Sequence, residues 1–254
     1  MENISELIPA FAVSIGVFIA LWPLSVLLTD ASIVDAWWGP GFLVAALISW
    51  SGTTDERAIL LLALVGIWAL RLGAMMIRRR IRHGAEDSRY KMIRESWGPS
   101  FWWKSLFIVF LLQGVLQCIV ALPPLIALQL PPYPLGVLGI IGALVATVGL
   151  TLETIADAQL DRFKRTATKD EICDTGLRAY VRHPNYTGEM IFWGGIWLIA
   201  AEAGAWWTVI SPMVLIFLLT KVSGAPMHQA TMELSRPAYA QYSLSTPAFL
   251  PNVK

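Results

Sequence analysis

The stretch Val181-Arg182-His183-Pro184-Asn185-Tyr186-Thr187-Gly188-Glu189 runs directly into the apolar segment Met190 to Ala201. A carboxylate such as Glu189 is costly in a bilayer unless it faces protein, water or a ligand. A plain helix start is the simpler alternative, with Pro184 in its first turn and Gly188 for packing. That alternative requires none of the Arg, His or Tyr side chains of the stretch, so the pattern favours a functional site at the entrance to a membrane helix.

The rest of the chain is typical of a polytopic membrane protein. Its 254 residues are 56% hydrophobic, with a mean hydropathy of +0.59, and the apolar residues form long runs separated by charged loops. Such runs exclude a soluble domain, and most have the roughly 17 to 25 residues that cross a bilayer, the sixth only if it starts within the stretch quoted above. The expected spans are Leu7 to Leu28, Ile33 to Trp50, Ala58 to Ile77, Trp103 to Leu125, Leu135 to Ala156, Met190 to Ala201 and Trp206 to Val222. We expect an all-α membrane helix bundle of about seven transmembrane helices, forming a single domain over residues 1–254.

Charge distribution predicts the orientation. Of the 19 Lys and Arg residues, all except Arg57 and Arg71 lie between the third and fourth spans, between the fifth and sixth, or after the seventh, when Lys104 and Lys221 at the ends of the fourth and seventh spans are counted with these segments. The positive-inside rule places these segments and the C-terminus in the cytoplasm, and an odd number of spans then places the N-terminus outside. The net charge of +1 gives no reason to expect nucleic acid as a partner, and Cys118 and Cys173 show neither metal-ligand spacing nor a plausible disulfide.

Several charged side chains fall within or at the ends of the spans. Asp35 stands in Val34-Asp35-Ala36-Trp37-Trp38-Gly39, Arg71 lies within the third span, and Glu153 and Asp157 end the fifth. Residues of this kind usually face the interior of a bundle. Because Glu153 and Asp157 are four apart, they share one helix face. The alternative to a binding site here is a structural ion-pair network.

Arginines gather at the end of the third span, where Arg78, Arg79, Arg80 and Arg82 precede Glu86-Asp87-Ser88-Arg89-Tyr90. The guanidinium fork suits phosphate, although such a cluster can also reach out to lipid headgroups. Two other patterns are interpreted as structural. The glycines of Gly136 to Gly142 predict close helix packing, and the prolines of Leu122 to Pro134 predict a loop.

The chain resembles the bacterial membrane proteins grouped with the steroid 5-alpha-reductases. The resemblance rests on the Arg182 to Glu189 motif, Trp193, Val34 to Gly39, Glu86 to Tyr90, and the C-terminal Ser223-Gly224-Ala225-Pro226, Arg236 to Tyr242 and Pro247 to Pro251. It implies an enzyme of the bacterial inner membrane that takes NADPH from the cytoplasmic side. It further implies reduction of an activated carbon–carbon double bond in a lipophilic substrate. No metal is expected, because the residues show no metal-ligand spacing.

Motif positions carry the family's site residues onto this chain. The resemblance implies Asp35 as the group that polarises a substrate carbonyl, with Tyr90 or Tyr186 as its tyrosine, because a loose alignment puts Trp68 where the family has Tyr. An indole can donate a hydrogen bond but does not readily release a proton. The expected cofactor-binding residues are Arg71, Arg79, Arg82, Asp157, Lys164, Arg182, His183, Asn185 and Glu189.

Two other functions remain open. The Arg-His-Pro-x-Tyr-x-Gly signature also resembles the isoprenylcysteine carboxyl methyltransferases, whose cofactor is S-adenosylmethionine. Those enzymes carry an acidic pair after the last helix, where this chain has Gln229 and a single Glu233. The third possibility is a membrane protein that binds lipid without catalysis.

Overall fold

The computed structural model describes residues 4–132, 134–168, 170–222, 225, 232, 236 and 238–251. Throughout these ranges the regular structure is helical, without a strand, as the sequence predicts. The chain divides into two compact units: unit 1 comprises residues 1–139 and 199–211, and unit 2 comprises residues 140–198 and 212–254. The prediction of a single membrane domain is left open by this division.

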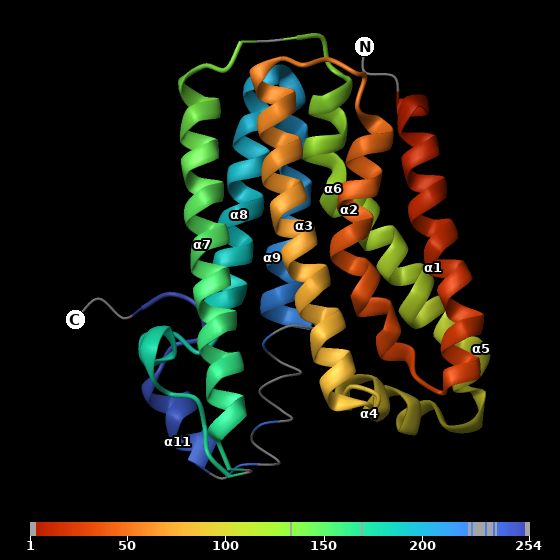
Figure 1. Cartoon of the computed structure of the whole chain (residues 1–254), viewed down its shortest axis with the longest axis vertical. Coiled ribbons are helices and arrows are strands. Elements are labelled where there is room, and N and C mark those ends of the chain that lie inside the picture. The colour runs from red at the N-terminus through yellow and green to blue at the C-terminus, as the bar shows by residue number, and fades with distance from the viewer. Residues whose placement is uncertain are drawn as a thin grey trace. The chain divides into compact units, whose positions relative to one another are not determined.

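Unit 1 is built from long apolar helices that pack through small residues. Its helix α2 packs against α1, α3 and α6 (Figure 1). A Cβ on Gly73 of α3 would lie 2.8 Å from the Pro40 ring of α2, so only glycine permits this approach of the two helices. The helices of unit 1 are α1 (Ile8–Leu28), α2 (Asp35–Ser49), α3 (Glu56–His83), α4 (Ser88–Trp97), α5 (Phe101–Ser105) and α6 (Leu112–Gln129).

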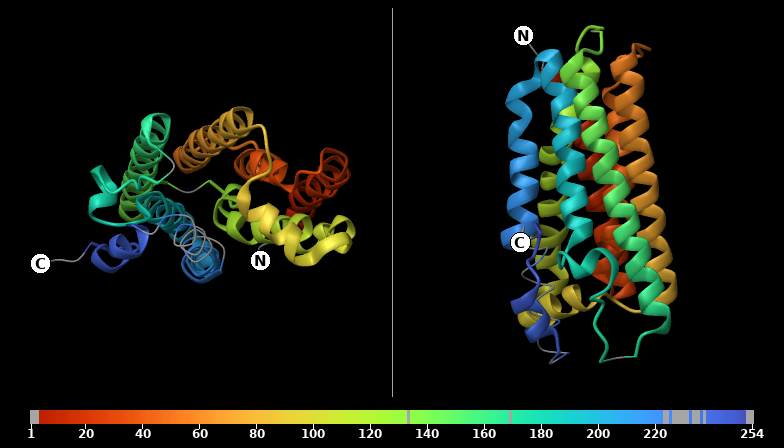
Figure 2. Two further views of the ribbon diagram at one scale, coloured as in Figure 1. Left: turned by 90° about the horizontal axis from the view of Figure 1, so that it is seen from below. Right: turned by 90° about the vertical axis from the view of Figure 1, so that its left-hand side faces the viewer.

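Unit 2 is centred on two helices that run side by side (Figures 1 and 2), α7 (Val137–Thr166) and α8 (Pro184–Ala200). A Cβ on Gly188 would lie 2.6 Å from the backbone nitrogen of Glu153 and 2.7 Å from the carbonyl oxygen of Gly149. The two backbones are therefore in direct contact, and the packing role expected of Gly188 is confirmed. The remaining helices of unit 2 are α9 (Ile210–Phe217), which begins at its border, and α11 (Ala238–Ser245).

Six helical segments in the described chain are long and apolar enough to cross a membrane. The last of them, Pro184–Val222, contains Gly204 with a φ of 107°, which interrupts the helix between α8 and α9. Counting α8 and α9 as separate spans reconciles the six segments with the predicted seven. Helix α8 begins at Pro184, so the sixth span does start within the quoted motif.

Helix α6 differs from the sequence-based prediction. It continues through Pro123 and Pro124 to Gln129, where a loop was expected. Each proline leaves the carbonyl four residues earlier without its helical hydrogen bond, and these carbonyls belong to Ile119 and Val120. The hydroxyl of Ser211 lies 2.5 Å from the Ile119 oxygen and 2.7 Å from the Val120 oxygen, and donates its proton to them. The helix persists because one hydroxyl proton from another segment, shared between the two oxygens, replaces part of what the prolines remove.

Candidate functional site

Asp35, Arg89 and Tyr90 form a hydrogen-bonded centre in unit 1. The Tyr90 hydroxyl donates to Asp35 Oδ1 over 2.6 Å, and Arg89 Nη2 donates to Asp35 Oδ2 over 2.9 Å. Asp35 is the first residue of α2, whereas Arg89 and Tyr90 occupy the first turn of α4. Both carboxylate oxygens of Asp35 therefore act as acceptors, and Tyr90 is the group that carries a transferable proton.

Tyr90 is held in a single orientation by its surroundings. Its side chain is buried, and Gln113 Nε2 donates to the Tyr90 oxygen over 2.9 Å. The ring belongs to an apolar cluster that includes Phe18, Val34 and Phe101. A phenol that donates to a carboxylate and accepts from an amide cannot rotate freely, so its proton points toward Asp35.

The arginines and carboxylates around this centre pair with one another. Arg79 Nη2 lies 2.7 Å from Asp87 Oδ2, and Arg89 Nε lies 3.0 Å from Asp87 Oδ1. The full set, called here the ionic clasp, comprises the carboxylates Asp30, Asp35, Glu86 and Asp87 and the arginines Arg79, Arg80, Arg89 and Arg94. Four positive and four negative charges balance, and the clasp joins the α1–α2 connection to the end of α3 and the start of α4.

Two carboxylates of the ionic clasp, Asp30 and Asp87, lie outside the membrane spans, and neighbouring groups keep both ionised. Burial opposes ionisation of Asp87, but the neighbouring Arg89 and Arg79 outweigh it and lower its pKa to about 2. Burial likewise opposes ionisation of Asp30, and the hydrogen bonds from Ser32 and Arg80 hold its pKa below the ordinary value. Both carboxylates are therefore charged at neutral pH, as pairing with arginine requires.

The polar motif of unit 2 is anchored by the C-terminal segment. The backbone nitrogens of Arg182 and His183 donate to the carbonyl oxygens of Pro247 and Ala248 over 2.9 and 3.0 Å. The buried His183 ring stacks on Tyr186, with ring centroids 5.4 Å apart. Two of the stretches on which the resemblance rests, Arg182 to Glu189 and Pro247 to Pro251, are thus in contact, although they are far apart in sequence.

Arg178 and Tyr242 complete this anchor and were not identified from the sequence. The Tyr242 hydroxyl donates to the Arg178 carbonyl over 2.5 Å, and Arg178 Nη1 donates to the Arg182 carbonyl over 2.5 Å. Burial raises the pKa of Tyr242 to about 12, so its hydroxyl keeps its proton at neutral pH. Tyr242 ends the Arg236 to Tyr242 stretch of the resemblance, but sequence alone gives no sign of its partner.

The expected cofactor residues divide between the two units. Asp157 and Lys164 lie on α7 and Arg182 to Glu189 at or near the start of α8, all in unit 2. Within the motif, Asn185, Tyr186 and Glu189 are partly exposed, whereas His183 is buried. Arg71, Arg79 and Arg82 lie on α3 in unit 1.

The tyrosine partner of Asp35 is Tyr90. Tyr186 belongs to unit 2, where it stacks on His183. Trp68 is fully buried and packs edge-on against Phe42, with ring centroids 5.3 Å apart. Of the three aromatic residues considered for this role, only Tyr90 has a hydrogen bond to Asp35 among the described contacts.

Two further kinds of site were considered, a metal centre and a methyltransferase site. In the described part of the chain, no group of three or more His, Cys, Asp or Glu side chains is arranged to hold a metal ion. The positions that bear on methyltransferase chemistry, Gln229 and Glu233, lie outside the described residues, as do Ser223, Gly224 and Pro226 of the family motif.

Comparison with known proteins places the chain in a family. The family model described as "Protein of unknown function (DUF1295)" matches residues 21–246, and the chain belongs to this family. No curated protein and no solved structure matches the chain significantly.

Proposed function

We propose that this member of the DUF1295 family is an NADPH-dependent membrane enzyme that reduces an activated carbon–carbon double bond in a lipophilic substrate. The observation that carries the proposal is the 2.6 Å hydrogen bond from the buried Tyr90 hydroxyl to Asp35. A buried tyrosine and a carboxylate at the end of a membrane helix are expensive to maintain without a function. The resemblance to the steroid 5-alpha-reductases, in which an acidic residue and a tyrosine polarise the substrate, supports the same assignment.

The chemistry assigned to unit 1 is polarisation of a conjugated carbonyl. NADPH, when bound, supplies a hydride to the carbon β to the carbonyl, and the electrons of the double bond move onto the carbonyl oxygen. For this step the Tyr90 hydroxyl turns its hydrogen bond from Asp35 to that oxygen, while the Gln113 amide continues to donate to the phenol oxygen and holds it in place. Arg89 donates to the second carboxylate oxygen of Asp35 and so fixes the orientation of that carboxylate. Preorganised donors of this kind stabilise charge as it develops on an oxyanion, and a proton from water at the α carbon completes the reduction.

The residues of unit 2 fit the phosphates of a dinucleotide. Arg178 is buried, and its Nε has no hydrogen-bond partner among the described residues, which leaves a cationic donor available. Arg182 stands just before the first turn of α8, where unsatisfied backbone N–H groups favour anions. We assign the cofactor to Arg178, Arg182, Asn185 and Glu189, with Asp157, Lys164 and His183 beside them on the same unit. Arg71, Arg79 and Arg82 lie on α3 in unit 1, where Arg79 is paired with Asp87, and the cofactor role that the resemblance implies for these arginines stays a prediction.

The proposal also includes a membrane and an orientation within it. We assign the protein to the bacterial inner membrane, with the arginine-rich end of α3 and the start of α8 facing the cytoplasm, where NADPH is available. The positive-inside rule supports this orientation because nearly all Lys and Arg residues lie in segments assigned to that side.

The test is cofactor binding by the full-length protein in detergent. Tryptophan fluorescence should report saturable binding of NADPH, with S-adenosylmethionine producing no change. The protein should then consume NADPH when supplied with lipophilic enones. Binding of S-adenosylmethionine instead would establish the methyltransferase alternative, and binding of neither would leave a lipid-binding protein.

A variant pair checks the cofactor assignment. Glu189→Gln and Asn185→Ala should weaken NADPH binding roughly tenfold while the protein inserts and folds. The first replaces a charged acceptor oxygen with a neutral amide NH2, and the second removes an amide, both at partly exposed positions. If both variants bind NADPH like the parent but aggregate, these residues serve only the start of α8.

A further inference from the structure

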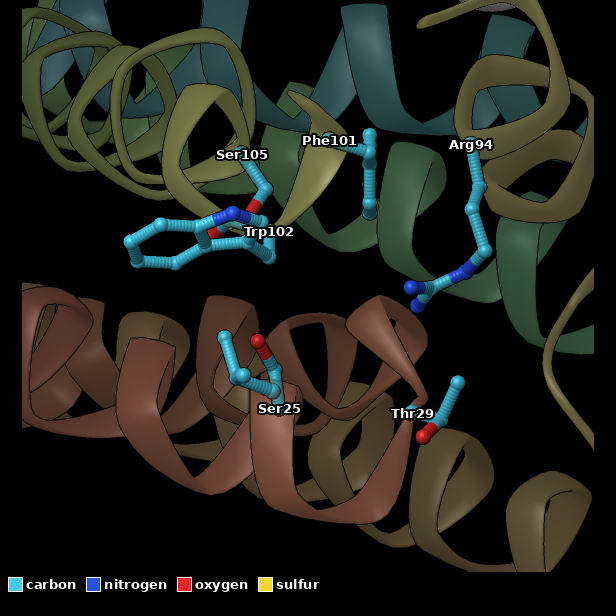
Figure 3. A pocket seen from close by; sticks show the side chains of 7 residues that line it. Ser25, Thr29, Arg94, Phe101, Trp102 and Ser105 are labelled. Atoms are coloured by element: carbon cyan, nitrogen blue, oxygen red, sulfur yellow. The ribbon is translucent and has the colours of Figure 1, made fainter. Parts of the chain in front are cut away.

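A small pocket lies in unit 1 between the C-terminal end of α1 and the α4–α5 corner (Figure 3). Its volume is about 190 Å³, and its walls include Ser25 and Thr29 from α1 and its cap, and Arg94, Trp102 and Ser105 from α4 and α5. This volume is below the roughly 300 Å³ at which pockets begin to enclose drug-sized ligands. A dinucleotide does not fit here, but a small headgroup does.

The pocket presents hydrogen-bond donors that the protein leaves unused. Arg94 Nε and Nη2 donate to Glu86 over 3.0 and 2.8 Å, and the structure gives Nη1 no protein partner in its described part. Within the same ranges, the Thr29 hydroxyl has none either. In Figure 3 the Arg94 side chain extends from α4 toward the α1 end, where Thr29 lies. Arg94 is the only charged residue of the lining, and its Nη1, which Glu86 does not engage, is a donor that an anionic group can accept from.

Acceptor atoms line the other side. The Ser25 hydroxyl donates to the Trp22 carbonyl over 2.7 Å, and the Ser105 hydroxyl donates to the Trp102 carbonyl over 3.0 Å. Each hydroxyl oxygen keeps lone pairs that can accept a hydrogen bond. A ligand that combines an anionic group with hydroxyl groups matches this arrangement of donors and acceptors.

Thr29 itself is held in an unfavourable conformation. Its φ of 52° makes it the only non-glycine residue with positive φ in the described chain. A β-branched residue rarely adopts this conformation, and glycine would do so without strain. Helix termination by itself therefore does not account for a threonine here, whereas a hydroxyl required by a ligand does.

The surroundings of the pocket are those of a membrane surface. Trp97, Trp102 and Trp103 are exposed, and Lys104 Nζ lies 4.4 Å from the centroid of the Trp97 ring. Tryptophan and lysine gather at the level of lipid headgroups, where one end of the side chain meets hydrocarbon and the other meets water. The pocket thus opens among residues typical of the interface.

We infer that this pocket binds the headgroup of an anionic phospholipid, with its phosphate on Arg94 and Thr29. The hydroxyl groups of a small headgroup such as phosphoglycerol then donate to Ser25 and Ser105, and the Trp102 and Phe101 rings form the apolar wall. This lipid site is independent of the proposed reduction and requires no NADPH.

The experiment measures lipid binding to full-length, delipidated protein in detergent by native mass spectrometry. Phosphatidylglycerol should bind more tightly than phosphatidylcholine, and inorganic phosphate should not compete. Thr29→Gly and Arg94→Lys should each weaken phosphatidylglycerol binding about tenfold, because each removes one donor to the phosphate. Lys91→Ala, which removes an exposed cation from the same helix outside the pocket, should bind like the parent.

Thermal unfolding separates a ligand role from a structural one. Without lipid, Thr29→Gly should unfold at the same temperature as the parent or higher, since glycine relieves the backbone strain. Stabilisation by phosphatidylglycerol should be smaller in this variant. The inference fails if both pocket variants bind phosphatidylglycerol like the parent. It also fails if phosphatidylcholine binds equally well, or if inorganic phosphate displaces the lipid.

Discussion

At the scale of single residues, the molecule uses charge in two ways. Most charges of the ionic clasp satisfy each other, as Arg94 and Glu86 do through two hydrogen bonds. Tyr90 differs, because it brings a neutral, proton-bearing group to a carboxylate already neutralised by Arg89. Charge pairing alone does not require that hydroxyl, and this makes Tyr90 the residue on which the proposed chemistry is best tested.

Tyr90→Phe should lower kcat/KM for an enone substrate on the order of 100-fold, since positioned proton donors typically contribute at least this much. NADPH binding should stay near the parent value, because the change is confined to unit 1. The measurement is NADPH consumption together with direct cofactor titration. Tyr180→Phe, at a tyrosine that is 68% exposed, is the matched control and should behave like the parent. Full activity in Tyr90→Phe would remove this tyrosine from the mechanism.

Two substitutions at Asp35 separate orientation from charge. Asp35→Asn keeps an oxygen that can accept from Tyr90, whereas Asp35→Leu keeps none. Turnover should therefore fall further in the Leu variant than in the Asn variant, with NADPH affinity unchanged in both, because only the interaction with the reacting carbonyl is impaired. Steady-state kinetics and cofactor titration check this. Loss of NADPH binding in Asp35→Leu would instead make Asp35 a structural or cofactor residue.

At the scale of elements, two contacts supply hydrogen-bond partners to backbone groups that have none within their own helix. Ser211 supplies donors to a helix interrupted by two prolines, and the C-terminal segment supplies acceptors to the start of α8. In each case a polar backbone group in an apolar setting determines which distant segment packs there. The Ser211 contact can be removed by deleting a single hydroxyl, whereas the contact at α8 joins backbone groups.

Ser211→Ala should lower the free energy of unfolding by about 1 to 3 kcal/mol, because it leaves buried carbonyls of α6 without a donor. Chemical denaturation in detergent measures the difference. Ser96→Ala is the control: its hydroxyl also donates to a carbonyl, that of Ile93, but at an exposed position. Equal losses in the two variants would show that burial of the Ser211 bond contributes nothing.

The Tyr242 contact predicts a pH dependence with a defined sign. The pKa of Tyr242 is raised from 10.0 to about 12, so the folded protein favours the protonated phenol. Its contribution to stability is therefore complete below pH 10 and is lost as the pH rises toward 12. Unfolding midpoints of the parent and Tyr242→Phe should differ below this window and converge within it. A difference that grows with pH would contradict the assignment.

At the scale of the whole molecule, the sequence predicted the helices better than their contacts. Apolar runs give the spans directly, because a bilayer demands a minimum length of apolar helix. The hydrogen bond from Tyr90 to Asp35 joins residues 55 apart, and no local pattern specifies it. The first part of the predicted proline loop, Leu122 to Gln129, is helical instead, and the sequence missed this because the compensating donor, Ser211, lies 91 residues away from Val120. The motif of α8 was recognised from its residues, but its C-terminal anchor was not.

Membrane orientation is the property of the whole chain that remains to be measured. Reporters fused to the two termini should show the N-terminus outside and the C-terminus in the cytoplasm, because all but two of the 19 basic residues lie in segments assigned to the cytoplasmic side. A third reporter inserted at Gly204, where the helix is interrupted between α8 and α9, should lie outside. This insertion distinguishes seven spans from six, since an unbroken Pro184–Val222 segment would bury the reporter in the bilayer. A C-terminus outside the cell would separate the start of α8 from cytoplasmic NADPH, and the proposed cofactor site would fall with it.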